Sequence, residues 1–428
     1  MSSHDLRSHG RRRFLEAGGA GLALALAGCA AMPSAATRSR VVVIGGGYGG
    51  ATAARYIRML DPSVEVTMIE PNTEFISCPM SNLVLGGFST IAAISTPYTA
   101  LTQRHGVRWV RDSATAIDLE KKEVRVSRGE TFGYDRLIVS PGIDFMWDAL
   151  PAMRAEEAQN YVLHAWKAGA QTFGLRRQLE SMPDGGVFVL SIPEAPYRCP
   201  PGPYERACQV AAFFKAHKPR SKVLVLDANG DVTSKGPLFK KAWAELYPGL
   251  IEYRPNTKAI DVDWRLKTVK LEFGDQKGDV LNVLPPMKAG SIAAPFITAN
   301  NRWCNVDWIT YESTAVKGVH VLGDSLQIAP AMPKSATMAN AHGKTCAAAV
   351  VALLRGEAPN ASPTLINTCY SMVSDKMAVH VASVHKYDEK DKTMKAVPGA
   401  GGVSAAMNEQ EAQYTWNWAK NIWADTLG

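Results

Sequence analysis

The feature that most constrains the fold is a glycine-rich turn near the start of the chain. A β-branched run at residues 41–44 leads into the pattern G-x-G-x-x-G, whose glycines are Gly45, Gly47 and Gly50. Such glycines allow a tight turn, a close approach of the backbone to a pyrophosphate, and close packing of helix on strand. A second strand ends at Glu70, 20 residues beyond Gly50, where an acid accepts hydrogen bonds from ribose hydroxyls. The sequence therefore predicts a βαβ dinucleotide-binding unit.

Two later segments favour FAD over NAD as the dinucleotide. One apolar strand is broken by Pro141 and Gly142, and another ends at Asp324. An Asp at a strand's carboxyl edge can accept hydrogen bonds from a ribityl chain, which NAD lacks; the alternative for Asp324 is a helix N-cap. A long, Ala-rich helix is predicted to begin near Lys334, and its dipole together with Lys334 would favour negative charge on a reduced flavin ring. These segments occur in the order typical of two-domain flavoproteins.

A second βαβ set is predicted around residues 160–290, but its first turn lacks the glycines. The strand at residues 187–192 leads into "PEAPYRCPPGPYE", whose five prolines remove backbone donors that a phosphate would need. This domain is therefore expected to keep the architecture without the nucleotide. Electrons would then not arrive from NAD(P)H, and Cys199 stands where the nicotinamide would otherwise come.

The seven cysteines form no C-x-x-C pair, no haem-attachment motif and no spacing that suggests zinc, so no metal site is predicted. Only Cys78 lies in the first domain, so any redox disulfide must join distant segments. Sequence spacing alone does not pair Cys199 with Cys369. Cys208 and Cys346 fall within predicted helices, which favours buried thiols.

Residues 1–36 have the composition of a targeting segment: a basic start, a short apolar run and then small residues. Within it, "RRRFL" at residues 11–15 fits the twin-arginine pattern, which predicts export to the periplasm after folding. "LAGC", ending at Cys29, also resembles a lipoprotein box, so the protein would meet the membrane only if lipidated there. The alternative is cleavage near residues 35–36. Disulfides persist in such a compartment.

Four segments together resemble the flavoprotein subunit of flavocytochrome c sulfide dehydrogenase: "FISCPMSNLVLGG", "RCPPGPYERACQ", "NTCYSM" and "YTWNWAKNIWADTLG". The likeness runs across nearly the whole chain from about Arg40. The expected fold class is α/β, with two Rossmann-like domains of the dinucleotide-binding type and an α+β C-terminal interface domain. The FAD-binding domain is predicted in two parts, at residues 38–150 and 291–355. A domain without a nucleotide motif is predicted at 151–290, and the C-terminal domain at 356–428.

The resemblance also implies roles for individual residues. FAD would be bound covalently by Cys78 through its 8α-methyl carbon, although Pro79 follows where the family has a tyrosine. Cys199 and Cys369 would form a redox disulfide over the flavin. Glu205 is a candidate base, and the alternative is an acid favoured by the helix dipole. The electron acceptor would be a c-type cytochrome.

The leading hypothesis is therefore a periplasmic enzyme that oxidises sulfide to sulfur or polysulfide and reduces a cytochrome. The alternatives are a sulfide:quinone oxidoreductase-like enzyme and an exported flavin-binding electron carrier without sulfide chemistry. A net charge of +7, scattered along the chain, argues against nucleic acid as a partner. Outside the N-terminus the sequence has no stretch of eighteen apolar residues, so no membrane-spanning helix is expected. The tryptophans of the final segment are predicted to be core or interface residues: Trp416, Trp418 and Trp423.

Overall fold

The structure, a computed structural model, describes residues 38–428. The predicted targeting segment at 1–36, with Cys29, lies outside the described residues. The predicted α/β fold class is confirmed, with two parallel sheets and an antiparallel C-terminal sheet. Among residues 38–428, no helix is long and apolar enough to cross a membrane, and no group of three His, Cys, Asp or Glu residues is placed to hold a metal ion.

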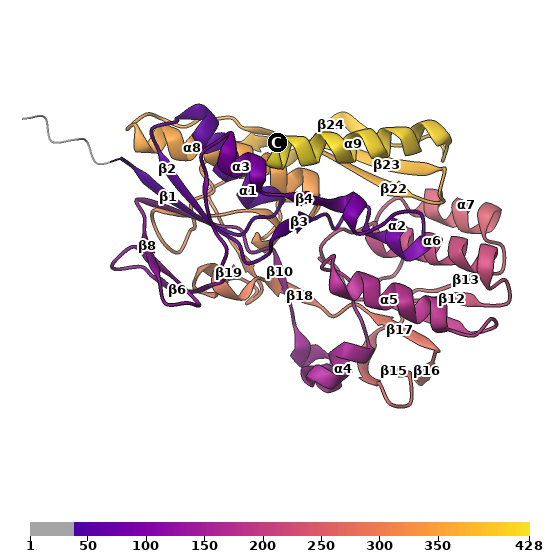
Figure 1. The fold of residues 1–428 in the computed structure, drawn as a ribbon. Coiled ribbons are helices and arrows are strands. Elements are labelled where there is room, and N and C mark those ends of the chain that lie inside the picture. Colours follow the sequence, from indigo (N-terminus) through magenta and orange to yellow (C-terminus); the bar gives the residue numbers. More distant parts are fainter. Residues whose placement is uncertain (1–37) are drawn as a thin grey trace, which may run out of the picture. The chain divides into compact units, whose positions relative to one another are not determined.

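The first domain is built on a five-stranded parallel sheet whose strand order is β21-β9-β1-β2-β5. Figure 1 labels two of its strands, β1 and β2. The central strand of the sheet is apolar and buried, as expected where helices cover both faces. The last strand joins the sheet after the chain has built the middle domain. The strands are β1 (Arg40–Ile44), β2 (Glu65–Ile69), β5 (Arg108–Val110), β9 (Arg136–Val139) and β21 (Val319–Val321).

Two helices of this domain pack closely together, namely α1 (Tyr48–Leu60) and α8 (Ala336–Leu354). Gly343 makes this approach possible, because a Cβ there would lie 2.6 Å from the carbonyl oxygen of Gly49. Short helices and antiparallel strands complete the domain: β3 (Glu74–Ile76), β4 (Ser95–Pro97), α2 (Ser81–Gly86), α3 (Thr99–Gln103), β6 (Ala114–Asp118), β7 (Glu123–Val126) and β8 (Thr131–Gly133).

The middle domain repeats the parallel arrangement in a four-stranded sheet of order β13-β12-β11-β17. Its strands are β11 (Val187–Ile192), β12 (Lys222–Asp227), β13 (Ile251–Arg254) and β17 (Val280–Val283). Its main helices are α5 (Ala170–Ser181), α6 (Gly202–His217) and α7 (Gly236–Leu246). Around it lie α4 (Glu156–Tyr161), β14 (Ala259–Asp263), β15 (Thr268–Leu271) and β16 (Asp275–Lys277). One strand pair lies where the chain leaves and re-enters the first domain, β10 (Ile143–Phe145) with β18 (Met287–Ala289). A second, β19 (Ile297–Ala299) with β20 (Trp303–Cys304), follows directly in the chain.

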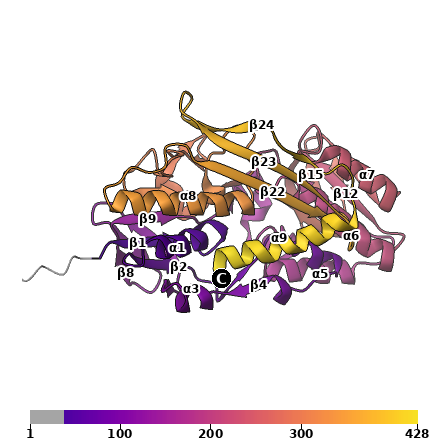
Figure 2. The same ribbon diagram turned by 90° about the horizontal axis from the view of Figure 1, so that it is seen from above.

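The C-terminal segment is a three-stranded antiparallel sheet followed by a long helix. It consists of β22 (Thr364–Met372), β23 (Ala378–Asp388), β24 (Thr393–Val403) and α9 (Glu409–Leu427). β22 contacts α8 of the first domain and α6 of the middle domain, and Figure 2 shows it running from one to the other. This strand therefore joins the two parallel-sheet domains.

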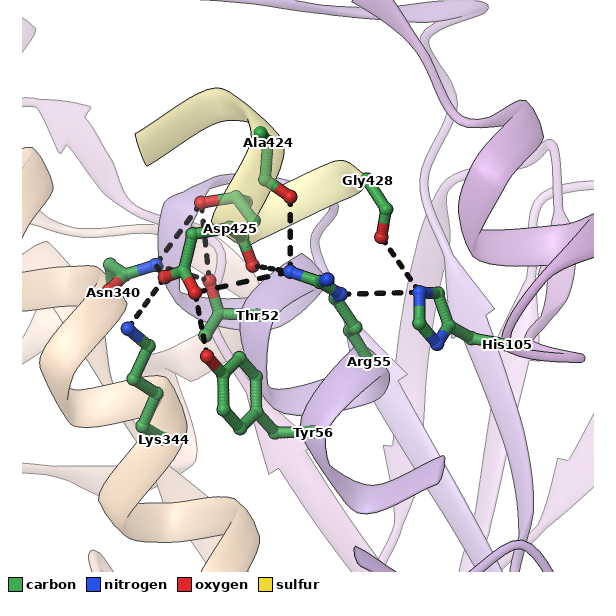
Figure 3. A network of polar contacts seen from close by, with 10 residues as sticks. Thr52, Arg55, Tyr56, His105, Asn340, Lys344, Ala424, Asp425 and Gly428 are labelled. Atoms are coloured by element: carbon green, nitrogen blue, oxygen red, sulfur yellow. Dashed lines mark hydrogen bonds and ion pairs between the residues drawn. The ribbon is translucent and has the colours of Figure 1, made fainter. Parts of the chain in front are cut away.

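The last turn of α9 is fixed to α1 and α8 by polar contacts (Figure 3). The carboxylate of Asp425 accepts hydrogen bonds from the hydroxyl of Tyr56 at 2.6 Å and from Nδ2 of Asn340 at 2.9 Å. It also pairs with Lys344 at 2.6 Å. Arg55 donates to the backbone carbonyls of Ala424 and Asp425, which belong to the last turn of the helix. The helix end is thus held by side chains from both neighbouring helices.

Candidate functional site

A cavity of about 320 Å³ is lined by residues of the first domain, the middle domain and the C-terminal segment. Most of the site residues predicted from the sequence contribute to its wall. Gly50 and Lys334 do not. Those in the wall are Gly45, Gly47, Glu70, Cys78, Pro141, Gly142, Cys199, Glu205, Asp324 and Cys369.

The three glycines of the first turn each meet a different steric condition. Gly45 has a φ of +100°, and a Cβ there would lie 2.3 Å from the carbonyl oxygen of Ser140. A Cβ on Gly50 would lie 1.9 Å from the carbonyl oxygen of Gly45, so the helix can pack here only without a side chain. Gly47 has nothing within 4 Å of its Cβ position and presents bare backbone to the cavity at the start of α1. This is the geometry in which a helix N-terminus binds a phosphate.

Glu70 follows β2 and is held against the glycine turn. Its Oε2 accepts a hydrogen bond from the N–H of Gly46 at 2.8 Å, and its Oε1 accepts from the N–H and Nδ2 of Asn72 at 2.9 and 2.6 Å. A carboxylate offers about four acceptor positions, so about one remains for a hydroxyl in the cavity. Glu70 and the glycines therefore fit the ribose and pyrophosphate of a dinucleotide.

Cys78 lies between β3 and α2, half-buried in the cavity wall. Its Sγ accepts a hydrogen bond from the N–H of Ala168 at 3.4 Å and from the guanidinium of Arg198 at 3.6 Å. The thiol can itself donate to the carbonyl oxygen of Trp166 at 3.8 Å. These contacts hold the sulfur of Cys78 at the edge of the cavity.

Cys199 and Cys369 meet at the cavity although 170 residues separate them in the sequence. Cys199 occupies the proline-rich turn before α6, with a φ of +60°, and its N–H donates to the carbonyl of Lys334 at 2.8 Å. A Cβ on Gly202 would lie 2.9 Å from Sγ of Cys199, so this turn needs its single glycine. Cys369 lies on β22. Both carry free thiols in the structure, and burial raises the pKa of each.

Glu205, in the first turn of α6, belongs to a buried polar network. Its Oε1 accepts from the N–H of Met372 at 2.9 Å, and its Oε2 accepts from Nδ2 of Asn82 at 3.0 Å. Oδ1 of Asn82 in turn accepts from Nε of Arg206 at 3.0 Å. Burial raises the pKa of Glu205 and lowers the pKa of Arg206 to about 9. One asparagine therefore bridges a buried carboxylate and a buried guanidinium.

Sequence analysis assigned no role to Asn82 or Arg206. The one signal for Arg206 was a cation within a largely apolar helix, in "YERACQVAAFF". The structure shows it to be 1% exposed, donating to the carbonyl oxygens of His164 and Ala165 as well. These contacts hold a loop that forms part of the cavity wall.

Lys334 lies behind the cavity wall and does not line the cavity, although its backbone carbonyl accepts from Cys199. Its Nζ donates to the carbonyls of Asp324, at 2.9 Å, and Leu326, and lies 3.6 Å from the ring centroid of Trp303. Asp324 does line the cavity, and it is not the cap of the long helix. α8 begins at Ala336, with Ser335 as its N-cap.

The fold and this site define a flavoprotein of the pyridine nucleotide-disulfide oxidoreductase type, with the glycine turn kept in the first domain and replaced in the second. Residues 39–171 match the family model of the pyridine nucleotide-disulphide oxidoreductases. Residues 172–285 match the central part of the sulfide dehydrogenase [flavocytochrome c] flavoprotein chain, and residues 361–427 match the flavocytochrome c sulphide dehydrogenase flavin-binding model. The chain belongs to the family of flavocytochrome c sulfide dehydrogenase flavoprotein chains.

Individual relatives agree with this family. The chain is 62% identical over 45 residues to the sulfide dehydrogenase flavoprotein chain of Chlorobaculum thiosulfatiphilum, which is 10% of this chain and 94% of that sequence. It is 23% identical over 306 residues to the mitochondrial sulfide:quinone oxidoreductase of Dictyostelium discoideum, covering 67% of this chain and 65% of that protein. The sulfide:quinone oxidoreductase structure from Aquifex aeolicus shares the fold, with a TM-score of 0.74 at 17% identity over 91% of both chains.

Proposed function

We propose that this protein oxidises sulfide to sulfur or polysulfide, using bound FAD and the cysteine pair, and passes the electrons to a c-type cytochrome. The observation that carries the proposal is the meeting of Cys199 and Cys369 in the same cavity as the dinucleotide-binding turn. A nucleotide-binding turn alone would suit many flavoproteins. Two distant cysteines converging on it indicate sulfur chemistry.

The residues of the cavity fit FAD and divide its binding between them. The turn at Gly47 would hold the pyrophosphate, Glu70 a ribose hydroxyl, and Asp324 the ribityl chain. Cys78 would form the covalent bond, with Arg198 holding its sulfur in position at the edge of the cavity. Bound FAD would supply an acceptor that takes up two electrons and releases them one at a time.

The cysteine pair would act as a disulfide toward the incoming sulfur nucleophile. Attack on a disulfide sulfur forms one S–S bond, breaks another and expels a thiolate. Glu205 lies in the same wall, and burial raises the pKa of its carboxyl, so its carboxylate is a better proton acceptor than an exposed one. It would take the proton of the incoming sulfide.

A spectroscopic experiment tests the proposal and its alternatives. Under anaerobic conditions, sulfide should bleach the flavin of the purified protein, and cytochrome c should reoxidise it faster than a soluble ubiquinone analogue does. Faster reoxidation by the quinone would favour the sulfide:quinone oxidoreductase alternative, which the Dictyostelium relative supports. A flavin that sulfide does not bleach would leave only the electron-carrier alternative.

The periplasmic location is proposed from the basic and apolar segment at residues 1–36. Replacing Arg11 and Arg12 by Lys should keep the protein in the cytoplasm, measured by cell fractionation. Replacing Cys29 by Ala should leave export intact and remove any membrane-bound fraction if that cysteine is lipidated. Unchanged export of the double Lys variant would contradict the twin-arginine route.

A further inference from the structure

One lysine is buried next to the cysteine pair. Lys235 is 6% exposed and stands just before α7 with a φ of +58°. Its Nζ donates to the carbonyl oxygen of Cys369 at 2.9 Å and to Oγ of Ser371 at 2.8 Å. Within residues 38–428, no carboxylate lies within ion-pair distance of this ammonium. Both of its acceptors are neutral groups on β22.

The charged and titratable groups that face Lys235 come from four parts of the fold. They are Cys369 on β22, Glu205 on α6, Cys199 in the proline-rich turn and Glu411 on α9. Burial lowers the pKa of Lys235 to about 8, so it still carries its charge at neutral pH. An ammonium without an ion-pair partner is costly to bury, and such groups cluster at functional sites.

The two cysteines have different surroundings. At Cys369, the charge of Lys235 favours the thiolate, and Sγ lies 3.4 Å from Oδ1 of Asn367. At Cys199, after burial, the groups with the largest effect are Cys369 and Glu205, and both oppose a thiolate. The weaker charges of Arg198 and Lys235 act in the other direction. Negative charge is therefore better accommodated on Cys369.

We infer that Lys235 is a positioning residue that makes Cys369 the leaving thiolate of the pair, so that hydrosulfide attacks Sγ of Cys199. In this step an S–S bond forms between hydrosulfide and Sγ of Cys199. The Cys199–Cys369 bond breaks, and its electron pair goes to Sγ of Cys369, the residue whose carbonyl accepts from the ammonium. The products are a persulfide on Cys199 and a thiolate on Cys369. The inference deepens the proposed function and depends on the two cysteines forming the redox disulfide.

The test measures thiolates directly and does not depend on turnover. The holoprotein is reduced, alkylated with iodoacetamide at a series of pH values and analysed by peptide mass spectrometry. In the wild type, Cys369 should titrate at a lower pH than Cys199. Lys235→Gln keeps a hydrogen-bond donor but loses the charge. In this variant, alkylation of Cys369 at neutral pH should slow by about tenfold, which equals a shift of its alkylation profile by about one pH unit. Lys235→Arg should restore much of the rate.

Lys240→Gln is the matched control, because Lys240 lies on α7, the helix that follows Lys235, but pairs at the surface with Asp231. It should leave both cysteine profiles unchanged. An unshifted Cys369 profile in a folded Lys235→Gln variant would overturn the inference. If that variant does not fold, the order in which the two cysteines of the wild type are alkylated as the pH rises decides. Alkylation of Cys199 at a lower pH than Cys369 would overturn the inference. The Cys369 profile could also shift in the variant while sulfide fails to reduce the flavin of the wild type. That result would reject the proposed function alone and support the charge effect of Lys235.

Discussion

The hydroxyl of Tyr204 donates a 2.7 Å hydrogen bond to Oδ2 of Asp227, the acid at the end of β12. The same oxygen accepts from the hydroxyl of Tyr253 at 3.0 Å, while Oδ1 accepts from the N–H and Nδ2 of Asn229 at 2.9 and 2.7 Å. All of the roughly four acceptor positions of this carboxylate are therefore used by the protein. Glu70, at the matching place in the first domain, keeps one available. The middle domain thus lacks both the glycine turn and a free acid for a ribose.

We predict that NADH and NADPH do not reduce the flavin. The turn at residues 193–203 lacks phosphate donors, and Asp227 has no position left for a ribose hydroxyl. Anaerobic stopped-flow mixing with either nucleotide should leave the absorbance of oxidised flavin unchanged. Dithionite should bleach the same sample, which shows that the flavin is reducible. Rapid bleaching by a nicotinamide nucleotide would contradict this account of the middle domain.

Covalent attachment of FAD at Cys78 is predicted to survive denaturation. Acid precipitation of the wild type should give a yellow pellet, and Cys78→Ala should release its flavin into the supernatant. Cys369→Ser is the control, since it alters another cavity cysteine and should keep the pellet yellow. If the wild-type flavin is found in the supernatant, the covalent bond is absent.

Cys199 and Cys369 are predicted to form the redox disulfide in the oxidised protein. Peptide mapping without reductant should recover one cross-linked pair that spans both segments. Cys199→Ser and Cys369→Ser should each abolish flavin reduction by sulfide, while photochemical reduction should continue because neither change touches the glycine turn. Turnover of sulfide by Cys199→Ser at a rate near wild type would mean that sulfide does not attack this pair.

Asn82→Ala should destabilise the fold strongly. It removes the bridge between Glu205 and Arg206 and leaves Oε2 of the buried carboxylate and Nε of the buried guanidinium without the hydrogen bonds that Asn82 made, a loss of about 3 kcal/mol in the free energy of unfolding. Urea titration followed by tryptophan fluorescence measures the change. Gln413→Ala removes an exposed amide from α9 and should have an effect near zero. Equal stabilities for the two variants would show that the bridge contributes little.

The pH dependence of stability should report on Glu205. Burial raises its pKa above the ordinary value of 4.5, so the folded protein binds this proton more tightly than the unfolded chain does. Its contribution is therefore complete below 4.5 and is lost as the pH rises through the folded pKa. Glu205→Gln does not titrate, so its stability relative to wild type should increase across that window. Urea unfolding at several pH values measures this, with exposed Glu272→Gln as the control. A constant difference would contradict the raised pKa.

The sequence predicted the features that depend on local spacing and did less well where distant segments pack. The strand, glycine turn and acid of the first domain lie within about thirty residues, and each glycine has a steric reason that a pattern can express. By contrast, Asn82 and Arg206 are 124 residues apart, and their hydrogen bond exists only because α2 packs on α6. Lys235 is buried by β22, more than a hundred residues further along the chain.

Lys334 shows a second limit of sequence reasoning. The prediction placed its charge at the flavin because it precedes the Ala-rich helix. The structure turns the side chain toward two backbone carbonyls and the face of Trp303. The direction of a long side chain depends on which nearby carbonyl groups lack hydrogen-bond partners. The periodicity of the sequence does not predict where those carbonyl groups lie. The position of the residue was predicted well, and the position of its ammonium was not.

The composition of the cavity wall also has a consequence for biosynthesis. The wall begins with Gly45 and includes Cys369 on β22 and Trp418 on α9. A nascent chain leaves the ribosome in sequence order, so the glycine turn emerges long before the strand and helix that complete the wall. A chain arrested ahead of β22 has the nucleotide turn and Cys78 but lacks one cysteine of the pair. Translation must therefore pass α9 before the cavity can close around a cofactor.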